Sequence, residues 1–171
     1  MLVSLIEMIE NNAADMAEDL KERLLQDPAT LSYQTLDEHT LYENIFELYS
    51  RLGHWLLRDT EKGEVRSHYS NIGRQRFEDG FPLHQIIQAL VATKKHIWDT
   101  VLEKGIMTTA KELDSAVDFI TYLNRFFDMA IYHTTLGYCE AQNLSTAILA
   151  ELQKSLGIPE DAPRRRFMLT R

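Results

Sequence analysis

The chain has 171 residues, of which 44% are hydrophobic and 26% are charged, and this balance predicts one compact domain with a single core. Its 18 basic and 26 acidic side chains leave a net charge of −8, which argues against nucleic acid or an anionic membrane surface as a partner. No segment approaches the ~18 uninterrupted apolar residues of a membrane span, and no secretory signal or pair of cysteines is present. We therefore expect a cytoplasmic protein.

Glycine and proline show how the chain is organised. The seven glycines and four prolines cluster between segments of helical periodicity, which predicts an all-α bundle of five or six helices with a globin-like or a simpler topology. We expect a single all-helical domain over residues 1–157 and a flexible tail over residues 158–171. The arginines at 164–166 lie in this tail, where chain ends are usually frayed.

Two helices are expected in the first third of the chain. Apolar residues recur every three or four positions over residues 2–26, which predicts a helix that ends at Asp27 and Pro28. Thr35 is followed three residues later by Glu38, the spacing of a capping box, and this predicts the start of a second helix. Two adjacent apolar stripes continue to about residue 59, which indicates that the second helix is buried on more than one side.

The middle of the chain has the clearest punctuation. Residues 64–78 predict a shorter helix closed by Gly80, because glycine suits the left-handed position that follows many helices. Pro82 then begins a strongly apolar helix that Gly105 ends. The shorter helix is dense in mixed charge, which is typical of a solvated face. Its Gly73 leaves open a close helix packing in which Arg74 turns inward.

The last helical segment is unusually long. Residues 108–156 contain no proline and one glycine, Gly137, so they predict either one long helix or two helices hinged there. The apolar surface is broad in the first half and narrow in the second. The narrow stripe consists of Leu144, Ile148, Leu149, Leu152 and Leu156. This change predicts a helix that leaves the bundle and forms a homodimer interface, with folding back onto the bundle as the alternative.

The sequence carries no recognisable catalytic or cofactor motif. It has no glycine-rich phosphate loop, no serine elbow, no HExxH zinc pair and no Glu-x-x-His di-iron spacing. We therefore predict that the chain is not an enzyme, with no catalytic residues, no bound metal and no cofactor. A site assembled from scattered carboxylates and arginines remains an alternative that spacing does not test.

Histidines provide a second alternative. His96 and His133 lie near apolar stripes, where an imidazole can ligate haem or a metal, although a histidine in such a place usually belongs to the core. Glu64 and His68 are four residues apart on one helical face, so they either share a metal or form a solvated contact. The sequence therefore keeps open a haem- or metal-binding sensor that uses core histidines.

One stretch resembles a known family. Residues 68–83, HYSNIGRQRFEDGFPL, and the apolar helix that follows resemble the helical N-terminal domain of RsbR-type proteins, the RsbT co-antagonists of the bacterial stressosome. The resemblance extends over residues 1–150. Its motif consists of Gly73, Arg74, Gly80, Pro82 and Trp98.

The resemblance implies a sensory, dimerising domain rather than a catalyst, whose last helix leads into a C-terminal STAS output domain. This sequence ends at Arg171 without room for that domain, so we expect a stand-alone relative or one that docks elsewhere. The resemblance supplies no ligand residues. We therefore predict a non-catalytic regulatory domain in stress-response-like signalling, which forms a homodimer, binds a protein partner and does not insert into a membrane.

Overall fold

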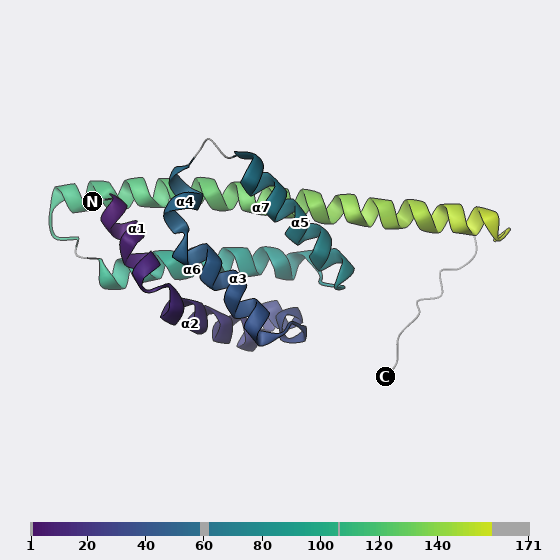
Figure 1. Cartoon of the computed structure of the whole chain (residues 1–171), viewed down its shortest axis with the longest axis horizontal. Helices are drawn as coiled ribbons and strands as arrows, with labels where there is room; N and C mark the ends of the chain where they lie inside the picture. The colour runs from purple at the N-terminus through teal and green to yellow at the C-terminus, as the bar shows by residue number, and fades with distance from the viewer. Residues whose placement is uncertain (1, 59–61, 106, 159–171) are drawn as a thin grey trace.

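The computed structural model describes residues 2–58, 62–105 and 107–158, and over these ranges the chain is an all-α bundle without strands (Figure 1). The elements are α1 (Leu2–Asn11), α2 (Ala13–Gln26), the 3₁₀ helix η1 (Pro28–Thr35), α3 (Glu38–Ser50), α4 (Leu52–Leu57), α5 (Lys62–Glu78), α6 (Leu83–Lys104) and α7 (Ala110–Ser155). The predicted fold class is confirmed. No helix in these ranges is long and apolar enough to cross a membrane.

The described ranges contain more helices than predicted because two of the expected helices are broken and because η1 was not expected. Asn12, with φ −103° and ψ 10°, separates α1 from α2, and its side-chain amide donates to the Met8 carbonyl at 2.7 Å. Such a bond from an asparagine competes with helical backbone pairing. Arg51, with φ −123° and ψ 27°, separates α3 from α4 by a similar departure from helical backbone angles. The single helices predicted over residues 2–26 and 35–59 are therefore each divided.

The start of the second predicted helix also differs from the expected one. Asp37, not Thr35, caps α3, because the Asp37 carboxylate accepts a hydrogen bond from the Thr40 backbone at 2.9 Å. Thr35 instead ends η1 and donates its hydroxyl to the Ser32 carbonyl at 2.7 Å. Spacing alone identified the wrong residue, since Asp and Thr both cap well and only the path of the chain selects between them.

The predicted ends of the middle helices are confirmed. Gly80 has a φ of +80°, and its N–H donates to the Phe77 carbonyl while the next N–H donates to the Arg76 carbonyl at 2.9 Å. This pair of bonds is the Schellman arrangement that closes a helix at a left-handed residue. Pro82 then caps the start of α6, and Gly105 follows its last residue.

The longest helix, α7, has 46 residues and passes through Gly137 without a hinge. Its first two thirds pack against the bundle, and its remainder projects beyond every other helix (Figure 1). The hydrophobic residues with no exposed surface come from α1, α2, α3, α4, α6 and α7: Ile9, Ala17, Tyr49, Leu52, Ile97, Val101, Phe119, Leu123, Phe127 and Ala130. The alternative in which residues 144–156 fold back into the core is therefore wrong.

The expected single domain over residues 1–157 and flexible tail over 158–171 stay predictions. Residues 159–171, which include the arginines at 164–166, lie outside the described residues.

Candidate functional site

Two glycines bring α5 and α7 into direct backbone contact. A Cβ atom placed on Gly73 of α5 would lie 2.0 Å from the Thr134 carbonyl oxygen, and one placed on Gly137 would lie 2.1 Å from the Ser70 carbonyl oxygen. No side chain fits at either distance, so this crossing requires glycine at both positions. The close packing considered for Gly73 is thus present, and Gly137 is a packing residue rather than a hinge.

Side chains around the crossing tie the end of α5 to α7. The Tyr138 hydroxyl of α7 donates to the Phe81 carbonyl at 2.8 Å, in the turn that follows α5. Arg74 pairs with Glu140 of α7 at 2.8 Å, but its side chain is 46% exposed. Arg74 therefore does not turn inward. The buried arginine of α5 is Arg76, whose side chain is only 12% exposed.

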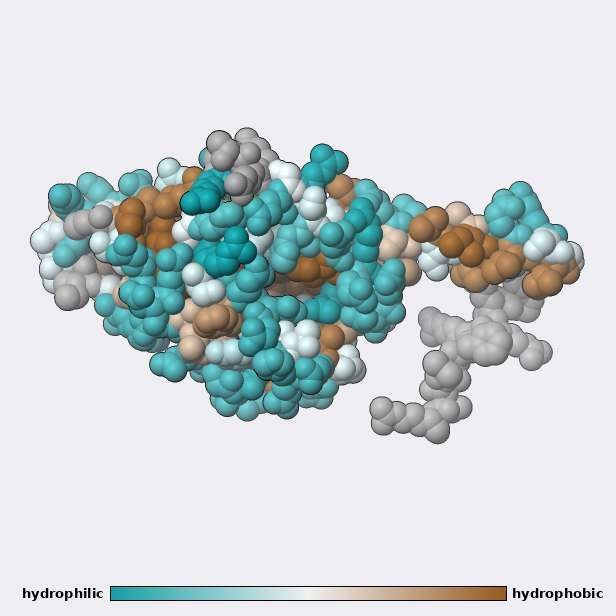
Figure 2. All heavy atoms as spheres, viewed as in Figure 1, coloured by the Kyte–Doolittle hydropathy of each residue, from teal (hydrophilic) through white to brown (hydrophobic). Residues whose placement is uncertain are grey.

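The five residues predicted as a dimer interface share one solvent-exposed surface, which we call the α7 stripe. Leu144, Ile148, Leu149, Leu152 and Leu156 have relative exposures of 64%, 52%, 58%, 51% and 71%. Figure 2 shows the projecting end of the molecule as a largely apolar surface. At its base, Leu144 and Ile148 line a groove together with Phe77 of α5. The stripe therefore begins where α7 leaves the bundle.

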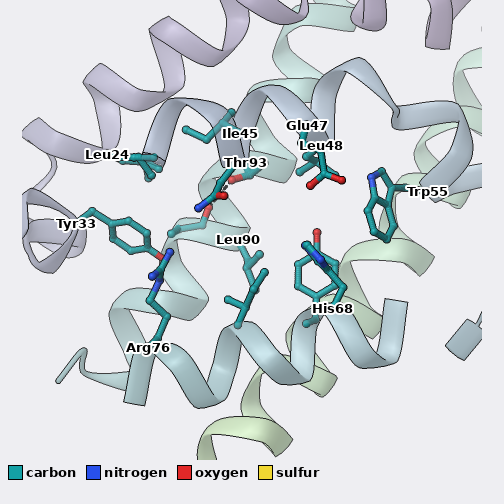
Figure 3. Close-up of a pocket in the computed structure, with 15 residues that line it drawn as sticks. Leu24, Tyr33, Ile45, Glu47, Leu48, Trp55, His68, Arg76, Leu90 and Thr93 are labelled. Carbon is teal, nitrogen blue, oxygen red and sulfur yellow. Dashed lines mark hydrogen bonds between the residues drawn. The ribbon is translucent and has the colours of Figure 1, made fainter. Parts of the chain in front are cut away.

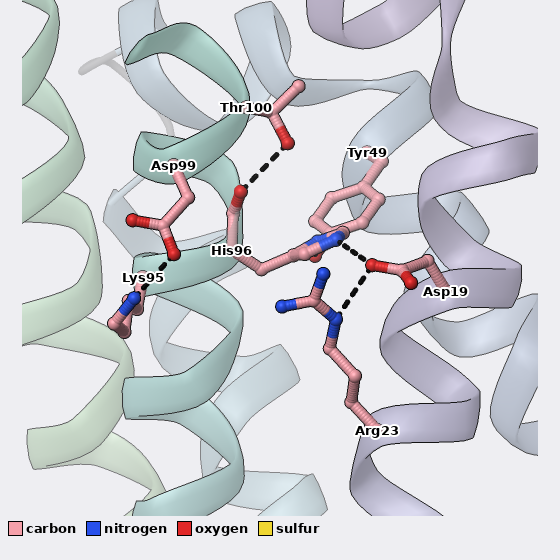
Figure 4. Close-up of polar contacts among 7 residues, drawn as sticks. All are labelled: Asp19, Arg23, Tyr49, Lys95, His96, Asp99 and Thr100. Carbon is pink, nitrogen blue, oxygen red and sulfur yellow. Dashed lines mark hydrogen bonds and ion pairs between the residues drawn. The ribbon is translucent and has the colours of Figure 1, made fainter. Parts of the chain in front are cut away.

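His96 is buried and forms a polar cluster with partners on two other helices (Figure 4). Its Nε2 lies 2.8 Å from an Asp19 carboxylate oxygen of α2, and its Nδ1 lies 2.8 Å from the Tyr49 hydroxyl of α3. Burial raises the pKa of Tyr49 well above its usual value, so this hydroxyl stays protonated and donates to Nδ1. Nε2–H then donates to Asp19, which also pairs with Arg23 at 2.8 Å.

This arrangement limits what His96 can do. Both of its ring nitrogens have protein partners, so coordination of haem iron or a metal would require the loss of one buried hydrogen bond. The cluster does link α2, α3 and α6, because each helix contributes one member. Its geometry supports a structural role in joining these helices.

The other candidate histidines do not form a common site. The Nδ1 atom of His133 on α7 is buried without a hydrogen-bond partner, and its ring lies 5.1 Å from that of Tyr132. Glu64 bonds to His54 at 2.8 Å rather than to His68, the residue four positions along its own helix. Among the described residues, no three His, Cys, Asp or Glu side chains are grouped to hold a metal ion.

Comparison with known proteins identifies the family. The family described as the RsbT co-antagonist protein rsbRD N-terminal domain matches residues 14–152. The chain belongs to this family. Neither the curated proteins nor the solved structures gave a significant match. The resemblance predicted from residues 68–83 is thus confirmed, and membership indicates a signalling domain related to the stressosome.

The family match covers the α5–α7 crossing, the His96 cluster and the α7 stripe as far as Leu152. Trp98, the last residue of the predicted motif, is half-buried and packs against the core from α6. Sequence reasoning singled out His96 but missed Asp19 and Tyr49, because no local spacing relates positions 19, 49 and 96. The available signal was weak: each residue lies beside an apolar stripe of its own helix.

Proposed function

We propose that this chain is a non-catalytic input domain in bacterial stress-response-like signalling, which forms a homodimer through the α7 stripe and docks a protein partner in the cytoplasm. One observation carries the proposal: a single continuous helix packs against the bundle over its first part and exposes an apolar stripe over its last part. Exposed apolar surface concentrated on one projecting element is typical of an interaction site.

The energetics of a projecting helix support a partner. Residues 142–155 extend about 21 Å at about 1.5 Å per residue, and none of them is buried. Helical segments this short are marginal in water when nothing packs against them. A second helix laid along the stripe removes its apolar side chains from water and stabilises the helical conformation.

The charge of the segment favours a second copy of the chain. Residues 142–158 contain one acidic residue, Glu151, and one basic residue, Lys154, although the whole chain carries a net charge of −8. Two copies of the segment therefore approach without net repulsion. Because α7 is continuous, a change in the bundle at the α5–α7 crossing reaches the interface through one rigid element.

Sedimentation velocity on the full chain and two double variants tests this proposal. Ile148→Glu with Leu152→Glu places charge on the stripe. Leu113→Glu with Val117→Glu is a matched control, because this pair has the same spacing on α7 and exposures of 56% and 55%. We expect twice the 19.9 kDa chain mass for wild type and control, and a folded monomer for the stripe variant.

A strictly monomeric wild-type chain would contradict the dimer. A stripe variant that stays dimeric would show that the interface lies within the bundle. Circular dichroism on all three proteins checks that each substitution leaves the helical content unchanged.

A further inference from the structure

A mostly apolar cavity of about 160 Å³ lies between α3 and α5, and α2, η1, α4 and α6 also contribute residues to its lining. Figure 3 shows Tyr33 and Arg76 at one end of this cavity and Glu47, His68 and Trp55 at the other. Apolar side chains from α2, α3 and α6 lie between the two ends. The cavity thus has a mostly apolar middle, which Thr93 also lines, and polar residues at each end.

Two residues that line this cavity have a buried hydrogen-bond donor without a partner. They are Arg76, at its Nε atom, and Trp55, at its indole Nε1 atom. Both atoms can only donate a hydrogen bond, so each of them needs an acceptor. Buried donors in native proteins are nearly always bonded, and an exception calls for a group that completes the site.

The Arg76 guanidinium is held in place by neighbouring groups, while its buried Nε has no hydrogen-bond partner. Its Nη1 pairs with Asp79 at 3.2 Å, and its plane lies 5.2 Å from the ring centre of Phe81 and 5.7 Å from that of Tyr33. Asp79 does not line the cavity, so this pair leaves the cavity end without an anion. The unpartnered donor belongs to a charged guanidinium, for which a carboxylate is the strongest acceptor.

We propose that this cavity binds a small organic monocarboxylate with a benzene-sized apolar body. The carboxylate accepts hydrogen bonds from Arg76 at one end, where the Tyr33 hydroxyl is a second donor. The apolar body lies against Ile45, Leu48 and Leu90. This inference rests on the proposed function as an input domain and names the chemical class of its signal.

Size and charge restrict the ligand to this class. In another protein, an apolar cavity of about 150 Å³ holds benzene, which sets the scale of the apolar body. A second carboxylate is disfavoured because Glu47 lies at the end opposite Arg76. A neutral molecule would leave the Arg76 edge with a weaker, uncharged bond.

The site is linked to α7 by direct contacts. Arg76 stacks on Phe81, and the Phe81 carbonyl accepts the hydrogen bond of Tyr138 on α7. Arg76 also lies three residues after Gly73, which touches the α7 backbone. A ligand that fixes Arg76 therefore acts on the end of α5 that holds α7.

Calorimetric titration of the full chain with benzoate, hexanoate and neutral benzamide tests the proposal. Trp98→Phe leaves Trp55 as the only tryptophan, so its fluorescence reports on the cavity. We expect saturable binding of benzoate or hexanoate with a change in Trp55 emission, and at least about tenfold weaker binding of benzamide. Arg76→Gln should weaken carboxylate binding by a similar factor. Arg74→Gln, on the exposed side of the same helix, should not.

Leu90→Phe provides an independent variant that retains Arg76 and fills the cavity, and we expect it to fold and to lose carboxylate binding. The proposal is overturned if neither carboxylate binds saturably, if benzamide binds as tightly as benzoate, or if Leu90→Phe binds like wild type. Sedimentation of the same samples keeps the two proposals separate. A dimer that binds no carboxylate rejects only the ligand site, and a monomer that binds benzoate rejects only the dimer.

Discussion

At the scale of single residues, the surroundings of His96 determine its protonation. Burial lowers its pKa, the Asp19 carboxylate opposes this shift by hydrogen bond and charge, and the Arg23 guanidinium adds to it. Asp99, which also faces this region of α6, raises the pKa slightly but is itself paired with Lys95. The net shift is downward, so the folded protein favours the neutral imidazole that accepts from Tyr49.

The direction of this shift predicts a loss of stability in acid. Between the ordinary histidine pKa of about 6.5 and the lower folded value, the unfolded chain binds a proton that the folded chain does not. The free energy of unfolding contributed by His96 is complete above about pH 7 and falls as the pH is lowered through this window. Urea unfolding at pH 7.5 and at lower pH should show this decrease, and His96→Gln should make it shallower.

His39 supplies the matched control for this measurement, because it is exposed on α3. His39→Gln should keep the wild-type dependence of stability on pH. Equal slopes for wild type and His96→Gln would show that the Asp19–His96–Tyr49 cluster does not set this dependence.

At the scale of elements, the packing of α5 on α7 depends on glycine. We predict that Gly137→Ala lowers the free energy of unfolding by about 3 kcal/mol, since its Cβ would lie 2.1 Å from the Ser70 carbonyl oxygen and the helices must separate. Gly63→Ala is the control, because Gly63 also lies in a helix and a Cβ there meets nothing within 4 Å. That variant should gain up to about 1 kcal/mol from helix propensity. Urea unfolding of both variants measures the difference, and equal stabilities would contradict the close crossing.

Local signals explain which elements were predictable from sequence. The ends of α5 and α6 follow from Gly80, Pro82 and Gly105, whose backbone preferences act without reference to the rest of the fold. The breaks at Asn12 and Arg51 were missed because the apolar period continues across both. Both α1 and α4 contribute side chains to the core on either side of these breaks, and periodicity alone does not show where a chain bends to pack.

The candidate sites also differ in whether local sequence signals could predict them. The α7 stripe was predictable because all of its members lie on one helix, and the narrowing of an apolar surface is visible in the sequence. The cavity at Arg76 was not, because its walls come from six separate elements. Arg74 and Arg76 are equivalent in the sequence pattern, and only the position of η1 and the turn at Phe81 buries the second.

At the scale of the whole molecule, the bundle and the projecting end of α7 are separable. The last buried residue of the described part of α7 is Gly137, and the contacts of Tyr138 and Glu140 complete the attachment to α5. Truncation after Asn143 therefore removes the α7 stripe but no core residue. The bundle should fold without it and keep its own cooperative unfolding.

If unfolding also separates two copies, the stability of the full chain depends on its concentration, because association stabilises only the folded state. A tenfold rise in concentration then adds about 1.4 kcal/mol per dimer, and because two chains unfold together, Tm rises by about 1.5 to 3 °C. We predict this rise for the full chain and a constant Tm for the chain truncated after Asn143, both followed by circular dichroism. A truncated chain whose Tm still rises would place the association surface in the bundle, whereas a constant Tm for both would mean that the stripe contributes no stabilising association between copies of the chain.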